Sequence, residues 1–220
     1  MRVEIVALCA TGDSDICVTF LLSEGPRQRK ESFVISPEAY ADFKLCKGES
    51  SCEVYDAIER ESRIYYAFKR GISSLGYGLC SSKMLISKLR TKGIAQEDAA
   101  EAVNRIVIKG YLDEAENAKR EAEVCAAKLW GESRIRAKLI ERRYSAEAID
   151  SALFHLEDSG VDFDESCKTL IDKTYARLPA DAQEMRKLIS AMSRRGYSIS
   201  QIKAACLALR DKKNRDMLYK

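Results

Sequence analysis

The strongest constraint on the fold is a pattern of apolar residues that occurs three times along the 220-residue chain. Between Trp130 and Gly160, apolar residues fall at helical spacing on both sides of a break at Arg143-Tyr144-Ser145. Such spacing predicts two short amphipathic helices that meet at a tight corner. The same positions are apolar 50 residues upstream and 53 residues downstream, without a gap. The chain is therefore predicted to be an array of three helical units.

Each copy of the pattern fills seven apolar positions. The copies are Leu85, Leu89, Ile94, Ala99, Ala102, Val103 and Ile106; Ile135, Leu139, Tyr144, Ile149, Ala152, Leu153 and Leu156; and Leu188, Met192, Tyr197, Ile202, Ala205, Cys206 and Leu209. A further helix is expected before each pair, opened in two units by Asp113 and Asp162 as N-caps. We predict a mainly α fold of three tandem three-helix repeats, each like a helix-turn-helix, in an elongated curved array.

The first 50 residues differ from the rest because they favour strands. Residues 2–8 and 15–22 are rich in β-branched side chains and predict a hairpin, with a third strand at 32–35. Ser36 and Pro37 then open a short helix, and Gly48 is expected to end that segment. The predicted divisions are a strand-rich extension at 1–50 and repeats at 51–111, 112–160 and 161–220. The last repeat includes a basic tail from Lys212, which we expect to fray.

Composition places the chain among soluble globular proteins, with 46% hydrophobic and 32% charged residues. No apolar run approaches the roughly 18 residues that a membrane span needs, and the start has no signal-peptide pattern. Eight cysteines form no C-x-x-C pair, which favours buried reduced thiols over disulfides or zinc. We therefore expect a cytoplasmic protein.

The net charge of +3 is unevenly distributed. Residues 1–50 carry 6 basic and 8 acidic side chains, a balance of −2, whereas residues 177–220 carry 11 and 4, a balance of +7. A basic end suggests a polyanion or an acidic protein groove as partner. It is equally compatible with a solvated helix face.

The sequence holds no pattern that indicates catalysis. The single histidine, His155, lies between two apolar residues, where a structural role is the expected one. No phosphate-binding glycine motif, nucleophile–histidine pair or metal-ligand spacing occurs. The acidic residues in first helical turns are explained by capping and the helix dipole. We predict no enzyme activity, no cofactor and no metal site.

Basic residues recur around the three predicted corners. Because the apolar positions share one register, these cations could form a broken stripe along one side of the array, although charged helix faces often serve solubility alone. The candidate partner-binding residues are Lys88, Arg90, Lys92, Arg134, Arg136, Lys138, Arg142, Arg143, Arg186, Lys187, Arg194 and Arg195. Tyr144 and Tyr197 could anchor a partner, but their apolar positions predict core packing instead.

Four short segments stand out along the helical part of the chain: KLRTKGI at 88–94, GYLD at 110–113, GESRIR at 131–136, and RRGYS at 194–198 with Ile202. Together they resemble the RecX family of bacterial recombination regulators. The resemblance covers about residues 50–210. Departures are Cys80 and Met84 in place of Arg and Glu, Lys138 in place of Glu, and Arg143 in place of a helix-ending Gly.

The resemblance implies a non-catalytic modulator of the RecA recombinase. Such proteins lie in the groove of the RecA–DNA filament and limit its extension, ATP hydrolysis and strand exchange. We expect a monomer without membrane contact and with at most weak, non-specific DNA binding. The alternative is a stand-alone helix-turn-helix DNA-binding protein, although no helix concentrates the Arg, Asn and Gln that read base edges. A helical scaffold for another partner is a third possibility.

Overall fold

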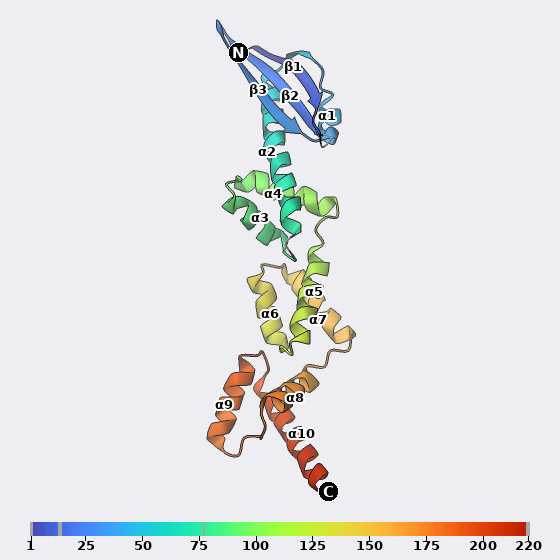
Figure 1. Ribbon diagram of the computed structural model, residues 1–220, viewed down its shortest axis with the longest axis vertical. Coiled ribbons are helices and arrows are strands. Elements are labelled where there is room, and N and C mark those ends of the chain that lie inside the picture. The colour runs from blue at the N-terminus through green and yellow to red at the C-terminus, as the bar shows by residue number, and fades with distance from the viewer. Residues whose placement is uncertain (1, 13–14, 77, 219–220) are drawn as a thin grey trace. The chain divides into compact units, whose positions relative to one another are not determined.

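The computed structural model describes residues 2–12, 15–76 and 78–218, with side chains as far as Asp211 (Figure 1). The chain is mainly helical, with a small antiparallel sheet at its start. It forms two compact units, Met1–Gly78 with Leu85–Leu112, and Leu79–Met84 with Asp113–Lys220. Within the described ranges, every helix is too short or too polar to cross a membrane.

The sheet of the first unit has four strands in the order β3-β2-β1-β4. β1 (Arg2–Ala10) and β2 (Ile16–Glu24) form the predicted hairpin, with a bulge between Ile5 and Ala7. β3 (Arg27–Ile35) pairs with β2 over its whole length and starts earlier than predicted. β4 (Gly48–Ser50) was not predicted, because a three-residue strand carries no periodic signal.

Helix α1 (Pro37–Phe43) follows the sheet and begins as predicted. The Ser36 side chain accepts a hydrogen bond from the Ala39 N–H, and Pro37 occupies the first turn. The expected end at Gly48 is wrong. Lys44, in the left-handed conformation, ends α1, and Gly48 opens β4.

Helix α2 (Cys52–Leu75) covers one face of the sheet and then supports the first helical pair (Figure 1). Near its start, the Tyr55 ring packs edge-on against Phe20 and Phe33, with centroids 5.3 and 5.5 Å apart. Near its end, α4 (Gln96–Ile108) crosses it so closely that a Cβ on Gly71 would lie 2.5 Å from the Ile106 Cδ1. The boundary between the units falls within α3 (Ser82–Thr91).

The second unit holds two further triplets of helices. The first consists of α5 (Glu114–Ala127), α6 (Glu132–Glu141) and α7 (Ala146–Asp158). The second consists of α8 (Phe163–Thr174), α9 (Ala182–Ser193) and α10 (Ile199–Leu218). In each, the first helix packs against the third. The backbone of α10 is helical to Leu218, past Lys212, and no Gly or Pro interrupts it. Fraying of the tail stays a prediction, and its side chains lie outside the described residues.

The three corners predicted from the repeat have one geometry. All repeated apolar residues are buried except Ile94, which is half-buried. At each corner one residue has positive φ: Gly93 at 85°, Arg143 at 60° and Gly196 at 95°. The N–H of the next residue then donates to the carbonyl five residues back, at 3.2–3.3 Å in all three. Arg143, which stands in place of a helix-ending glycine, therefore leaves the geometry of its corner unchanged. The three-helix repeat is confirmed.

The cysteines follow the prediction only in part. All eight lie among the described residues, and none of them forms a disulfide. Cys80, Cys125, Cys167 and Cys206 are buried as expected, and burial raises the pKa of Cys167 to about 12. The expectation is wrong for the strand-rich region. There Cys9 near the end of β1, Cys46 in the loop before β4 and Cys52 at the start of α2 are exposed.

A buried polar network supports the second triplet. The Glu121 carboxylate of α5 accepts hydrogen bonds from the Arg142 Nε at 2.8 Å and from the Tyr144 hydroxyl at 3.0 Å. Burial, together with the neighbouring Glu121 charge, raises the pKa of Tyr144 well above its ordinary value of 10.0. Tyr144 is thus a core residue that serves its own triplet, as its apolar position predicted.

Replacing Arg143 by glycine should stabilise the second unit. A non-glycine residue in the left-handed region destabilises the folded state by about 1–2 kcal/mol. Glycine removes this strain, but it loses more conformational freedom on folding, which offsets about 0.5–1 kcal/mol of the gain. We expect Arg143→Gly to raise the free energy of unfolding by about 0.5–1 kcal/mol, measured by urea denaturation. Arg143→Ala keeps the strained backbone and serves as control, so an equal gain in both variants would contradict the explanation.

Tyr144 should also make the protein sensitive to alkali. The pKa of Tyr144 is higher in the folded protein than in the unfolded one. The contribution of its neutral hydroxyl to the free energy of unfolding is therefore complete below pH 10 and is lost as the pH rises from the unfolded pKa towards the folded one. Between pH 8 and pH 11, Tyr144→Phe should lose about 1.4 kcal/mol less stability than the parent chain. Urea denaturation at both pH values tests this, and identical losses in the two proteins would refute it.

Candidate interaction surface

The twelve cations of the predicted stripe are divided between the two units. Lys88, Arg90 and Lys92 belong to the first unit, and the other nine belong to the second. A continuous stripe across both units stays a prediction. Within the second unit, however, the surroundings of each cation distinguish side chains held in ion pairs from those that are not.

Three of the nine cations in the second unit are bound by carboxylates. The Arg136 guanidinium lies 2.7 Å from Asp150, and the Lys138 ammonium lies 3.0 Å from Glu141. Arg142 bonds Glu121 and also donates to the Leu79 carbonyl at 3.2 Å, so it joins elements within its unit. These three side chains have structural contacts that compete with a partner.

Three other predicted cations, Arg134, Arg194 and Arg195, lie where the two triplets of this unit meet. The Gly131 N–H, just before α6, donates to the Arg195 carbonyl at 2.8 Å, and the Ser133 hydroxyl donates to the Gly196 carbonyl at 2.8 Å. The backbones touch so closely that a Cβ on Gly131 would lie 2.3 Å from the Gly196 oxygen. This contact brings together two sequence motifs that are about 60 residues apart, the one at 131–136 and the one at 194–198.

An aromatic side chain and an arginine lie at this contact. The Arg134 guanidinium stacks over the Trp130 ring, 3.8 Å from its centroid. Its Nη1 also lies 3.5 Å from the Arg194 carbonyl, at the limit of a hydrogen bond. Such stacking orients a guanidinium while leaving its outer N–H groups available. We call the set Trp130, Gly131, Arg134, Arg194, Arg195 and Gly196 the basic junction.

The basic junction carries uncompensated positive charge. Within the described part of the chain, no carboxylate forms an ion pair with Arg134, Arg194 or Arg195, and the last two are exposed. Arg194 donates to the Ser190 hydroxyl at 3.0 Å, which is a neutral acceptor. Arg143, Arg186 and Lys187 are also exposed in this unit. The junction can therefore receive an anionic group without first breaking an ion pair.

The single histidine has a structural contact, as predicted. His155 Nε2 lies 2.8 Å from the Glu123 carboxylate of α5, which ties α7 to the first helix of its triplet. In the first triplet the corresponding position is Arg105, which binds Glu61 of α2 through two hydrogen bonds of 2.6 and 2.9 Å. Both side chains therefore join the third helix to the first.

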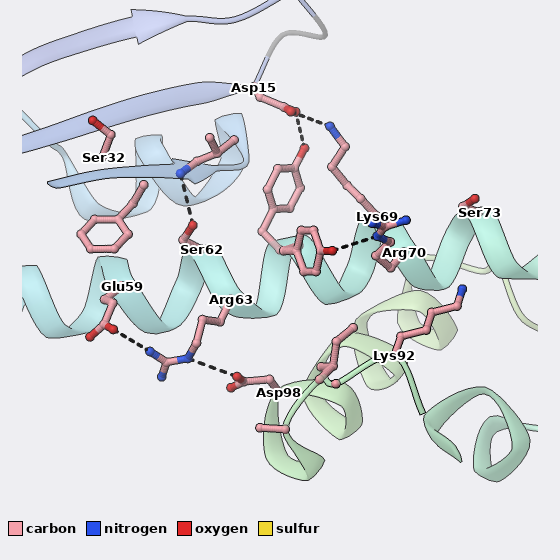
Figure 2. A pocket seen from close by; sticks show the side chains of 17 residues that line it. Asp15, Ser32, Glu59, Ser62, Arg63, Lys69, Arg70, Ser73, Lys92 and Asp98 are labelled. Carbon is pink, nitrogen blue, oxygen red and sulfur yellow. Dashed lines mark hydrogen bonds and ion pairs between the residues drawn. The ribbon is translucent and has the colours of Figure 1, made fainter. Parts of the chain in front are cut away.

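A second surface, in the first unit, was not predicted. A groove of about 940 Å³ runs along α2 between the end of β3 and the corner that joins α3 to α4. Figure 2 shows Arg63 of α2 between Glu59 and Asp98, at 3.1 and 3.2 Å, and Lys69 against Asp15 at 2.6 Å. The Lys69 and Tyr65 hydrogen bonds lower the pKa of Asp15. Of the predicted cations, only Lys92 lines this groove.

The sequence offered one signal for this groove. Polar residues of α2 recur at helical spacing over Glu59, Ser62, Arg63, Tyr66, Lys69, Arg70 and Ser73. This pattern is also that of any solvated helix face, so it could not by itself indicate a groove.

Known proteins similar to this chain share one name. No protein-family model matches. "Regulatory protein RecX" of Ectopseudomonas mendocina is 34% identical over 119 residues, which are 54% of this chain and 77% of the relative. The protein of that name from Pseudomonas fluorescens is 33% identical over 119 residues, or 54% and 75%. The one from Xanthomonas axonopodis pv. citri is 32% identical over 126 residues, or 57% and 76%.

Two solved structures share the fold. A crystal structure of regulatory protein RecX has a TM-score of 0.71 at 19% identity and covers 92% of this chain and 99% of its own. RecX from Lactobacillus salivarius has a TM-score of 0.58 at 19% identity and covers 67% and 97%. The tandem helical triplets place this chain in the class of helical-repeat proteins. Within that class, this chain belongs to the RecX family.

The contact at the basic junction can be tested by adding one methyl group. Gly196 and Gly160 both have positive φ, at 95° and 81°, but a Cβ on Gly196 would lie 2.6 Å from the Arg134 Cβ, whereas one on Gly160 meets open space. Overpacking of this kind costs about 1–3 kcal/mol. We expect Gly196→Ala to lower the free energy of unfolding by that much more than Gly160→Ala. Urea denaturation measures the difference, and equal losses would show that the close approach is not a stabilising constraint.

Proposed function

We propose that this protein regulates the RecA recombinase by binding in the groove of the RecA–DNA filament. Bound there, it limits filament extension, ATP hydrolysis and strand exchange without any catalytic step of its own. Membership in the RecX family supports the proposal, and so does the basic junction, which is the observation that carries it. The protein would act in the cytoplasm and as a monomer. The hydrophobic core that each unit has of its own is compatible with a monomer.

The chemistry of the basic junction suits a protein groove lined by carboxylates. Arg134, Arg194 and Arg195 would form charge-assisted hydrogen bonds with such a surface, and the Gly131–Gly196 contact fixes their backbone positions. Trp130 is half-buried beneath Arg134, so the pair can provide an anchor of the kind that dominates protein interfaces. Charge complementarity speeds association and sets register, while such anchors supply affinity.

Repetition of the triplet suits a repetitive target. A filament presents the same groove at regular intervals, and a protein built from repeats can place equivalent helices against successive subunits. The cations around the other corners, among them Lys88, Arg90, Arg186 and Lys187, would then contact neighbouring subunits and add avidity. Their contribution should be smaller than that of the junction, because isolated charges near the surface contribute little to binding. Arg90, Arg186 and Lys187 are exposed, and Lys88 is half-buried.

The test is the ATPase activity of RecA on single-stranded DNA, with the purified protein added below one molecule per RecA subunit. The parent chain should inhibit, and Arg194→Glu combined with Arg195→Glu should need about tenfold more protein for the same inhibition. This loss corresponds to about 1.4 kcal/mol of binding free energy. The matched control reverses two exposed lysines of the same unit, Lys173→Glu with Lys203→Glu.

Three outcomes would count against the proposal. No inhibition by the parent chain would reject RecA regulation. Equal loss in the two double variants would reject the basic junction as the contact. A strong preference for one DNA sequence in the absence of RecA would favour the stand-alone DNA-binding protein instead, because groove binding predicts salt-dependent affinity without sequence preference.

A further inference from the structure

The α2 groove of the first unit holds charges that its own carboxylates do not neutralise. Glu59 and Asp98 share Arg63, and Asp15 accepts hydrogen bonds from Lys69 and Tyr65. Arg70 and Lys92 have no carboxylate partner within the described residues. The Lys92 ammonium donates to the Ser74 hydroxyl, at 2.9 Å, and the Arg70 Nε donates to the Tyr66 hydroxyl. In Figure 2, Arg70 and Lys92 lie on the side of the groove near Ser73. A negatively charged ligand would therefore be attracted to this end.

An exposed aromatic ring lies beside these cations. Tyr66 is 54% exposed, which is unusual for so large a side chain in the middle of a long helix. The Arg70 guanidinium lies over its ring, 5.3 Å from the centroid, and the Arg70 Nε donates to its hydroxyl at 3.0 Å. This arrangement fixes the ring in one orientation and leaves it partly uncovered. A planar group can stack there, next to a cation.

Hydroxyl groups complete the polar lining. Ser62 accepts a hydrogen bond from the Val34 N–H at 3.2 Å, and its own hydrogen remains available for donation into the groove. Ser73 lies on the same face of α2, three residues from Arg70. From Glu59 to Ser73 the face is roughly 21 Å long, since a helix rises about 1.5 Å per residue. Cations, hydroxyls and a ring thus follow one line.

We propose that the α2 groove binds a short segment of single-stranded nucleic acid. Backbone phosphates contact Arg70 and Lys92, the serine hydroxyls donate to phosphate oxygens, and one base stacks on Tyr66. Proteins that bind single strands without sequence preference combine a basic track with aromatic platforms in this way. The site goes beyond the proposed RecA contact, because it lies in the other unit and needs no second protein.

Two features favour a single strand over other anions. The stacked bases of a duplex have no face free for Tyr66, whereas an unpaired base can stack on the ring. An acidic protein segment would satisfy Arg70 and Lys92, but it would leave the exposed, arginine-oriented ring without its characteristic partner. A strand of nucleotides supplies both groups at short, regular intervals.

The experiment measures the affinity of the full chain for a fluorescein-labelled oligothymidylate by fluorescence anisotropy, without RecA. Arg70→Glu combined with Lys92→Glu should weaken binding about tenfold or more at low salt. Removal of two phosphate contacts should also reduce the slope of log affinity against log salt by about 1.4. The control is Arg27→Glu with Lys47→Glu, two exposed cations of the same unit outside the groove, which should leave both quantities near the parent values.

Stacking is tested separately from charge. Tyr66→Ala should weaken binding by about fivefold or more, because one base stacked on an aromatic ring contributes about 1–3 kcal/mol. Tyr66→Phe keeps the ring and should bind like the parent chain. Thermal unfolding followed by circular dichroism shows that each variant is folded, which is expected because Tyr66, Arg70 and Lys92 lie outside the core.

Several results would overturn the site. One is a loss of affinity in the Arg27/Lys47 control equal to that in the groove variant. Another is an affinity that depends on Arg194 and Arg195 but not on Arg70 and Lys92, which would place the nucleic acid at the basic junction. A third is no binding of the oligonucleotide when polyglutamate does bind through the groove, which would identify an acidic protein segment as the ligand. Since RecA is absent, none of these results bears on ATPase inhibition.

Discussion

One left-handed residue at each helical corner determines how the triplets pack. It ends the first helix of the pair and turns the chain so that the next N–H bonds back to a carbonyl five residues earlier. The apolar residues of both helices then face the same side and are covered by the first helix of the triplet. The energy of burying that face exceeds the local backbone strain, which is why Arg143 can occupy a position that glycine takes in the other two corners.

Charge is distributed according to the same packing. The carboxylates that lie nearly buried between helices each bind a cation of their own unit, as in Glu61 with Arg105 and Glu121 with Arg142. Among the described residues, no buried side-chain nitrogen or oxygen lacks a hydrogen-bond partner. At the basic junction and at one end of the α2 groove, by contrast, cations lie without a carboxylate partner among the described residues. Both proposed contacts are consequences of this arrangement.

The helical repeat could be predicted from the sequence because it depends on local periodicity. A residue at 85, 135 or 188 must be apolar for its helix to pack, and spacing reveals that requirement. Strand β4 could not be predicted, since three residues give no period. Likewise, Arg142 looks like any exposed cation in the sequence, and only the tertiary position of Glu121 shows that it is engaged.

The candidate surfaces show the same limit. The sequence identified the motifs at 131–136 and 194–198 but not that their glycines touch, because the contact joins residues 65 positions apart. The α2 groove was missed for a related reason. Its walls come from Asp15 before β2, from β3 and α2, and from the corner between α3 and α4 with the start of α4, and each wall alone looks like an ordinary solvated face. Periodicity in the sequence shows which residues of one helix are buried, but not which residues far apart in the sequence lie side by side.

The Gly131 amide has a consequence for folding as well as for shape. Its hydrogen-bond acceptor is a carbonyl of the next triplet, so the start of α6 is complete only when α9 and α10 are in place. In repeat proteins, such neighbour contacts convert independently stable segments into one cooperative transition. The last two triplets should accordingly unfold together. Loss of the C-terminal helices would loosen the start of α6 and with it the Trp130–Arg134 side of the basic junction, although these residues precede the lost helices in the chain.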